Sequence, residues 1–180
     1  MGMFFNVRLD SLDDLLLLQL KDLYDAEQRL CEAIPDMAEA AASPGLAQAF
    51  QSHLEQTKRH VSRLEQAFVD LGRPAGRETC DAMKGLIKEC AEIVDADGDP
   101  DVKDAALIAA AQRVEHYEIA SYGSARTFAQ RLGHTTVARL LQMTLDEEKE
   151  TDQRLNQLAE ERINIRAGSA QSERDIPLTN

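Results

Sequence analysis

The sequence predicts an all-α protein, an antiparallel four-helix bundle with an additional helix in the long connection between the second and third bundle helices. Hydrophobic residues make up 43% of the 180 residues, but aromatic residues only 4%, and Trp is absent. A core built mostly from Leu, Ile, Val and Ala favours helices over a β-sandwich. Apolar residues also recur three and four positions apart over long stretches that short connections separate. The length suits one domain with a sizeable core.

The first predicted helix covers about residues 11–41. Ser11 and Asp14 resemble a capping box at its start, and Pro35 is expected to kink or briefly break it. One face carries the apolar residues Leu16, Leu20, Leu23, Leu30 and Ile34. Glu27 falls on this face, between the third and fourth of these residues, where a leucine would be expected.

The second predicted helix follows the turn at residues 43–45 and ends at Leu71, before Gly72. Its apolar stripe consists of Phe50, Leu54, Val61, Leu64, Phe68 and Leu71. His60 lies on this stripe and is predicted to point inward. Glu55 lies on the opposite side and is predicted to be solvated.

The connection to the third bundle helix contains an amphipathic segment at about residues 78–94. It has no acid at the centre of its apolar face, so we expect a helix packed outside the four others. The acidic loop 95–101 resembles a calcium-binding loop, but Ala106 stands where the bidentate Glu should be. We expect Asp99 or Asp101 to cap the next helix instead.

The third and fourth bundle helices, at about residues 102–132 and 135–163, also carry inward acids. Glu115 and Glu118 share one helix face because they are three residues apart. Two carboxylates this close repel each other unless a cation or a proton lies between them. Glu148 interrupts the apolar stripe of the last helix in the same way.

Composition also sets the expected environment of the chain. We expect one helical domain over residues 1–166 and a disordered tail over 167–180, which has little to bury. The formal net charge of −12 argues against nucleic acid and anionic membrane surfaces as partners. No apolar run approaches the roughly 20 residues of a membrane span, and no signal segment is recognisable, so a cytoplasmic location is expected. The cysteines Cys31, Cys80 and Cys90 lack metal-site spacing and are interpreted as reduced core thiols.

The inward polar residues together predict a metal site. A buried carboxylate or imidazole costs several kcal/mol unless something compensates it. Such residues fall near the middle of all four bundle helices, so a shared cation is the simplest compensation. The predicted ligands are Glu27, His60, Glu115, Glu118 and Glu148.

Each of these residues also has a simpler explanation. His60 alone could be a hydrogen-bonded core histidine. Glu27 and Glu148 could each pair with an arginine, either Arg63 or Arg113. Of the two acids on the third bundle helix, one could be buried while the other reaches solvent. The sequence leaves these alternatives open.

Four segments resemble the ferritin-like superfamily, whose helix bundle holds a dinuclear iron or manganese centre. They are LKDLYDAEQRL, HLEQTKRHVSRLEQAF, AALIAAAQRVEHYEIASYGSARTFA and LDEEKETDQRL. Over about residues 11–159 they are most similar to the bacterial stress-associated proteins of the YciE/YciF type. Glu115-x-x-Glu118 with Tyr117 also resembles rubrerythrin, over a shorter stretch.

The chain departs from the superfamily pattern of Glu-x-x-His on two helices. Here the second helix reads Thr57-x-x-His60 and the fourth reads Glu148-x-x-Thr151. The remaining carboxylates and imidazole are hard ligands suited to iron or manganese. His53 lies two turns, roughly 10 Å, from His60 along the helix, which is too far for the same ion. Whether one or two metal positions remain is left open.

The resemblance implies a carboxylate-bridged centre that reacts with oxygen or peroxide in stress defence. An oxidase, peroxidase or catalase-type activity is one hypothesis, with no catalytic residue assigned. The alternative is a non-catalytic structural or interaction protein with a vestigial or single-metal site, which the two threonines favour. Iron storage in a cage is not implied. A homodimer is expected, as is an external electron donor, because rubredoxin-like cysteine pairs are absent from the sequence.

Overall fold

A computed structural model describes residues 9–174 of the chain, and every regular element in that range is helical. This confirms the predicted all-α fold. The elements are α1 (Leu12–Ala40), α2 (Pro44–Asp70), α3 (Asp81–Val94), α4 (Pro100–Arg131), α5 (Thr135–Leu158), the π-helical turn η1 (Ala159–Ile163) and α6 (Asn164–Arg174).

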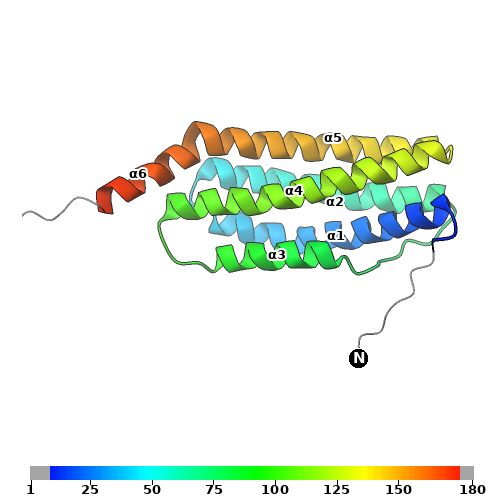
Figure 1. Cartoon of the computed structure of the whole chain (residues 1–180), viewed down its shortest axis with the longest axis horizontal. Helices are drawn as coiled ribbons and strands as arrows, with labels where there is room; N and C mark the ends of the chain where they lie inside the picture. The colour runs from blue at the N-terminus through cyan, green and yellow to red at the C-terminus, as the bar shows by residue number, and fades with distance from the viewer. Residues whose placement is uncertain (1–8, 175–180) are drawn as a thin grey trace, which may run out of the picture.

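The four long helices α1, α2, α4 and α5 form a bundle (Figure 1). Helix α1 packs against α2 and α4, and α5 packs against the same two helices. Helix α3 lies outside, against α1 and α4, as the sequence predicts. Because α3 carries the chain back along the bundle, α2 and α4 run in the same direction and each packed pair of bundle helices is antiparallel.

Local sequence signals account for the ends of these helices. The Ser11 hydroxyl accepts a hydrogen bond from the Asp14 amide at 3.1 Å, which confirms the predicted cap of α1. Of the two predicted caps of α4, the structure uses Asp99. Glycines with positive φ, at 64° for Gly72 and 81° for Gly133, follow α2 and α4. Pro35 lies inside α1, which continues as a single helix.

The core consists of two apolar clusters at opposite ends of the bundle. One contains Leu30, Ile34, Phe50, Leu107 and Leu155, and the other contains Leu16, Leu20, Phe68, Tyr122 and Leu141. Each bundle helix passes from one cluster to the other through a short stretch that carries buried polar residues. The fold therefore places a polar layer between two apolar layers.

The predicted disordered tail from residue 167 is wrong for residues 167–174. The chain continues from α5 through η1 into α6, which ends at Arg174, and α6 packs against α4. The prediction weighed the shortage of apolar residues but not the good helix formers Ala, Gln, Glu and Arg in this stretch. Residues 175–180 of that prediction lie outside the described range.

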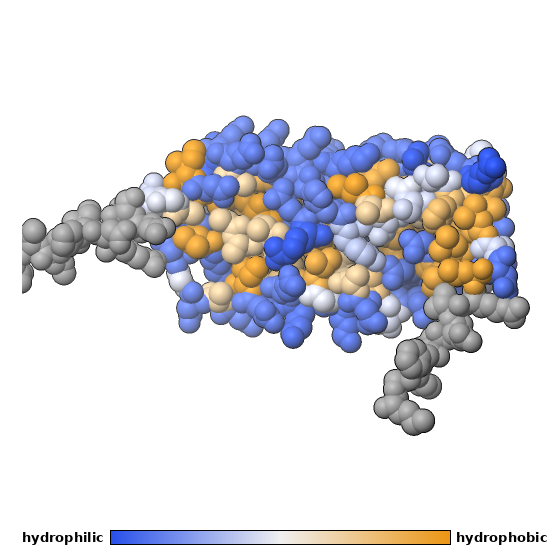
Figure 2. Space-filling view, viewed as in Figure 1, coloured by the Kyte–Doolittle hydropathy of each residue, from blue (hydrophilic) through white to orange (hydrophobic). Residues whose placement is uncertain are grey.

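The surface is largely hydrophilic (Figure 2). On the face shown, apolar residues gather between α3 and α4 and near the start of α1. None of the helices in residues 9–174 combines the length and apolar character that a membrane crossing requires. Cys80 and Cys90 are buried, Cys31 is half-buried, and none of the three forms a disulfide.

Candidate metal centre

Six buried residues meet in the polar layer at the middle of the bundle. Helix α1 supplies one, α2 and α4 supply two each, and α5 supplies one, and no member is more than 4% exposed. They are Glu27, His53, His60, Glu115, Glu118 and Glu148. All five ligands predicted from the sequence are present in this set, and His53 is the sixth.

The first half of the cluster is built around His60. Its Nδ1 atom lies 2.9 Å from Oε1 of Glu148 and 3.3 Å from Oε1 of Glu27. Despite these short distances, Nδ1 has no partner in hydrogen-bond geometry. This ring nitrogen therefore lies within ion-pair distance of two carboxylates, one on α1 and one on α5, but forms no hydrogen bond with either of them.

The second half contains His53, Glu115 and Glu118, again with Glu148. One ligand atom from each of these four residues lies within 4.8 Å of the others. Nε2 of His53 is 3.3 Å from Oε1 of Glu115. Glu148 belongs to both halves and is the residue that they share.

The donor atoms of each half lie close enough together to contact one ion. Adjacent ligands of an octahedral ion with bonds of about 2.1 Å lie roughly 3 Å apart. The nitrogen–oxygen distances from His53 and His60 to the carboxylates are 2.9–3.3 Å. Among the described residues, nine buried side-chain nitrogen or oxygen atoms lack a hydrogen-bond partner, and eight belong to the six cluster residues. The donor set therefore fits one or two hard cations.

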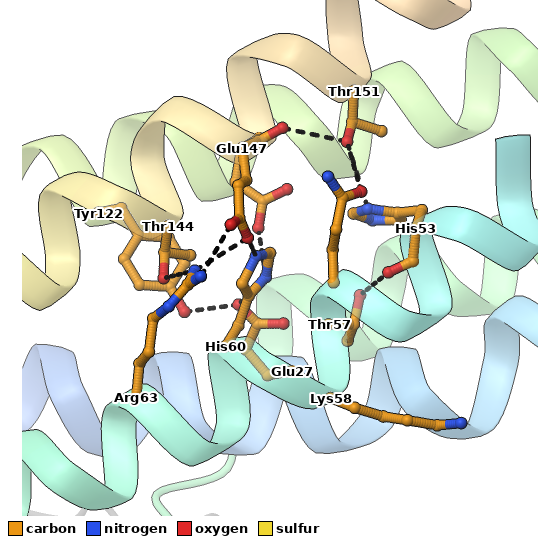
Figure 3. Close-up of polar contacts among 12 residues, drawn as sticks. Glu27, His53, Thr57, Lys58, His60, Arg63, Tyr122, Thr144, Glu147 and Thr151 are labelled. Carbon is orange, nitrogen blue, oxygen red and sulfur yellow. Dashed lines mark hydrogen bonds and ion pairs between the residues drawn. The ribbon is translucent and has the colours of Figure 1, made fainter.

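Behind His60, a carboxylate and an arginine fix the orientation of the ring (Figure 3). Nε2 of His60 lies 2.8 Å from Glu147, and Arg63 donates two hydrogen bonds of 2.9 and 2.7 Å to the same carboxylate. Burial alone would raise the pKa of Glu147, but Arg63 and His60 lower it to about 2. A carboxylate held on the far nitrogen commonly orients a metal-binding histidine. Sequence reasoning missed Glu147 because it lies beside the apolar stripe.

The two threonines at the departures from the superfamily motif have different roles. The Thr57 hydroxyl donates to the His53 carbonyl at 3.0 Å, within α2. The Thr151 hydroxyl donates to the Glu147 carbonyl at 3.1 Å and lies 3.4 Å from Nδ1 of His53 (Figure 3). While it donates to Glu147, Thr151 can also accept a hydrogen bond from Nδ1–H of His53, and in that tautomer the lone pair of Nε2 is directed toward the carboxylates.

Tyrosines support the cluster from α4. The Tyr122 hydroxyl donates a 2.5 Å hydrogen bond to Oε1 of Glu27. Tyr117 points to the other side and donates to Asp22, with the Cys80 sulfur 3.0 Å from its hydroxyl.

The pKa values of the cluster residues are shifted because several acids are buried together and no cation lies between them. Desolvation, followed by repulsion from neighbouring carboxylates, raises the pKa of Glu115 and of Glu118 well above the ordinary value of 4.5. Burial also disfavours charge on His60, but Glu27 and Glu148 outweigh it and raise the His60 pKa to about 10. Burial lowers the pKa of His53, which favours its neutral form. Without metal, the cluster therefore holds protons where cations would bind.

Of the simpler explanations from the sequence, a hydrogen-bonded core histidine is met, because His60 is buried and its Nε2 lies 2.8 Å from Glu147, whereas the proposed arginine pairs and the divided acids are not. Arg63 pairs with Glu147, and Arg113 pairs with Glu89 at 3.3 Å. Neither arginine therefore forms an ion pair with Glu27 or Glu148 within the described range. The acids of α4 are both buried rather than divided between core and solvent. Glu55, predicted to be solvated, is exposed.

The fold and the cluster together define an all-α bundle protein with a candidate metal centre inside the bundle. Comparison with known proteins identifies its family. A family model described as a domain of unknown function, DUF892, matches residues 11–168, and the chain belongs to this family. Protein YciF of Escherichia coli strain K12 is 42% identical over 162 residues, which cover 89% of this chain and 98% of YciF.

Solved structures support the same assignment. The crystal structure of the E. coli stress protein YciF matches with a TM-score of 0.84 at 43% identity, covering 87% of this chain and 99% of that one. YcfI of Rhodopseudomonas palustris, for which a structural role has been suggested, matches with a TM-score of 0.80 at 42% identity over 86% and 98% of the two chains. A Xanthomonas campestris protein, 20% identical over 89% and 99% of the two chains, shares the fold with a TM-score of 0.70.

Proposed function

We propose that this chain is a ferritin-like stress-response protein that binds two iron or manganese ions in its core and reacts with oxygen or peroxide. The observation that carries the proposal is the pair of donor groups sharing Glu148. Such a concentration of buried, unbonded acids is costly in a fold that does not use them. The similarity to the E. coli stress protein YciF supports the stress role.

The donor groups suggest how the ions divide between the two positions. Glu27, His60 and Glu148 would hold one ion, and His53 with Glu115, Glu118 and Glu148 would hold the other. Carboxylates and imidazoles are ligands that suit iron and manganese. In this assignment His53 takes the place of the histidine that the superfamily motif has at Thr151.

Two ferrous ions would supply two electrons, which together with two protons reduce one dioxygen to hydrogen peroxide. The residues of the chain prepare the site for this chemistry. Glu147 and Arg63 hold the His60 ring, and Tyr122 holds Glu27. The apolar layers on both sides exclude bulk water from the cluster.

An alternative is a structural or interaction protein with a vestigial or single-metal site. It is favoured by Thr57, which occupies a position where the motif has a carboxylate and instead bonds its own helix. The structural role suggested for the R. palustris relative points the same way.

Metal stoichiometry separates the two proposals. Metal-stripped protein is loaded anaerobically with Fe²⁺ or Mn²⁺, desalted, and analysed for metal per chain. Two ions per chain are expected in the unaltered protein. The count should fall to one in His53→Ala if the two halves bind independently. The control His116→Ala, on the exposed face of α4, should leave the count unchanged. One ion in the unaltered protein would favour the single-metal alternative, and none would refute metal-dependent chemistry.

A further inference from the structure

A small cavity lies directly beside the second half of the cluster. Its volume is about 20 Å³, and His53 and Glu115 form part of its wall. The rest of the wall is mainly apolar and includes Leu30, Phe50 and Val114. The cluster thus borders an apolar space on the side of the His53 group.

The size and lining of this cavity restrict what it can hold. A cavity needs at least about 10–15 Å³ to accept one water-sized molecule, so this one has room for a single small molecule. A hydrogen-bonding occupant such as hydrogen peroxide would lose most of its bonds to water in exchange for few partners here. An apolar diatomic molecule such as dioxygen forms no strong hydrogen bonds with water, so it pays no such penalty on entering the cavity.

An outer groove leads to the same place from the surface. It lies between α2 and α5, has a volume of about 540 Å³, and is lined by polar residues such as Gln48, Gln56 and Arg154. Ala49, Thr151 and Leu155 line both the groove and the cavity. These three side chains form the wall that the two spaces share.

Thr151 is the polar residue of this shared wall. Figure 3 shows it on α5, facing His53 across the gap to α2. The motif resembled by this segment would place a histidine at this position, and a ring would fill more of the passage. In this chain the imidazole at the cluster comes from His53 on α2 instead of from a histidine on α5. The α5 position therefore carries the smaller side chain of Thr151, between the groove and the cavity.

We propose that dioxygen enters through the groove between α2 and α5, passes Ala49 and Thr151, and binds in the apolar cavity beside His53 and Glu115. This inference rests on the proposed function, because the cavity matters only if the cluster binds reducing metal ions. The inference adds to the proposed function a route of entry and a binding place, and it names dioxygen rather than peroxide as the molecule that occupies the cavity.

Xenon tests the cavity without any metal. Crystals of the metal-free protein are pressurised with xenon, an apolar atom that binds in apolar cavities. Xenon is expected in the cavity of the unaltered protein and of the control Ala47→Leu, and absent from Ala49→Leu. Ala47 is half-buried on the same helix but lines neither space. No xenon in the unaltered protein, or equal occupancy in Ala49→Leu, would overturn the proposal.

Oxidation kinetics then test the route in Fe²⁺-loaded protein of verified metal content. Ala49→Leu is expected to slow oxidation by dioxygen about tenfold, which corresponds to about 1.4 kcal/mol of added barrier, with Ala47→Leu unchanged. An equal slowing with peroxide would overturn the commitment to dioxygen. If Ala49→Leu does not fold, Ala111→Val, on the inner wall of the cavity, takes its place in both measurements. Normal metal content without xenon refutes only the route, whereas xenon without metal binding refutes the proposed function.

Discussion

Replacing Glu118 with glutamine should stabilise the metal-free protein. Glu118 is fully buried, and neither of its carboxylate oxygens has a hydrogen-bond partner. Burial first, and then repulsion from Glu27 and Glu148, raises its pKa well above the ordinary value. Folding of the metal-free protein therefore favours the protonated form of this carboxyl, whereas the unfolded chain ionises it at its ordinary pKa.

The size of the effect follows from this difference in protonation. Each pH unit by which the pKa of this carboxyl exceeds its ordinary value costs the folded metal-free protein about 1.36 kcal/mol at neutral pH. Glutamine has nearly the same shape as a protonated glutamate and does not ionise, so it avoids this cost of protonation. Glu118→Gln should therefore raise the free energy of unfolding by about 2–3 kcal/mol and Tm by roughly 4–12 °C. Near pH 4.5 the gain should shrink toward zero, because the unfolded chain is also protonated there.

Urea and thermal unfolding of metal-stripped protein at pH 7 and pH 5 measure this gain. The matched control is Glu39→Gln, which removes the same charge from an exposed position on α1 and should change stability by less than about 0.5 kcal/mol. If Glu118→Gln were no more stable than Glu39→Gln at pH 7, the reasoning would be refuted. Metal at a hundred times Kd should cancel most of this gain, since it stabilises a binding-competent chain by about 2.7 kcal/mol.

Three further predictions concern the cluster and the layers around it. Metal loading should release protons, and metal affinity should fall as the pH is lowered. The reason is that the α4 glutamates and His60, whose pKa is about 10, must lose protons to bind a metal ion. Calorimetry in buffers of different ionisation enthalpy measures both the proton release and the affinity. Glu147→Gln should weaken metal binding about 10–100-fold by freeing the His60 ring, and metal titration would contradict this if the exposed control Glu150→Gln had the same effect. Leu20→Ala, at a fully buried position, should cost about 2–5 kcal/mol in urea unfolding, and a loss below 1 kcal/mol would contradict the packing described.

Most of the fold could be predicted from the sequence, because the helices obey local rules. Apolar periodicity located the bundle helices, and Ser11 and Gly72 marked ends that the structure confirms. The extension through α6 to Arg174 could not be predicted in this way. It depends on continuous helical hydrogen bonding and on contact with α4, neither of which leaves an apolar stripe in the sequence.

The inward residues of the candidate site could also be predicted, but their partners could not. Glu27, Glu115, Glu118 and Glu148 interrupt apolar stripes, and burial at these positions is confirmed. Glu147 escaped this reasoning because its function depends on Arg63 of another helix. A contact between side chains 84 residues apart leaves no periodic signal in the sequence.

His53 shows why a broken motif in the sequence need not mean a broken site in space. Counted along α2, it lies two turns from His60, so a search for ligands of one ion excludes it. In the bundle it reaches Thr151 of α5, with 3.4 Å between the threonine oxygen and Nδ1, while its Nε2 faces Glu115. An imidazole contributed by α2 thus lies beside Thr151, the α5 position at which the motif has its histidine. Because helices at a bundle core present side chains to a common centre, a ligand can move between helices while the set of donors stays the same.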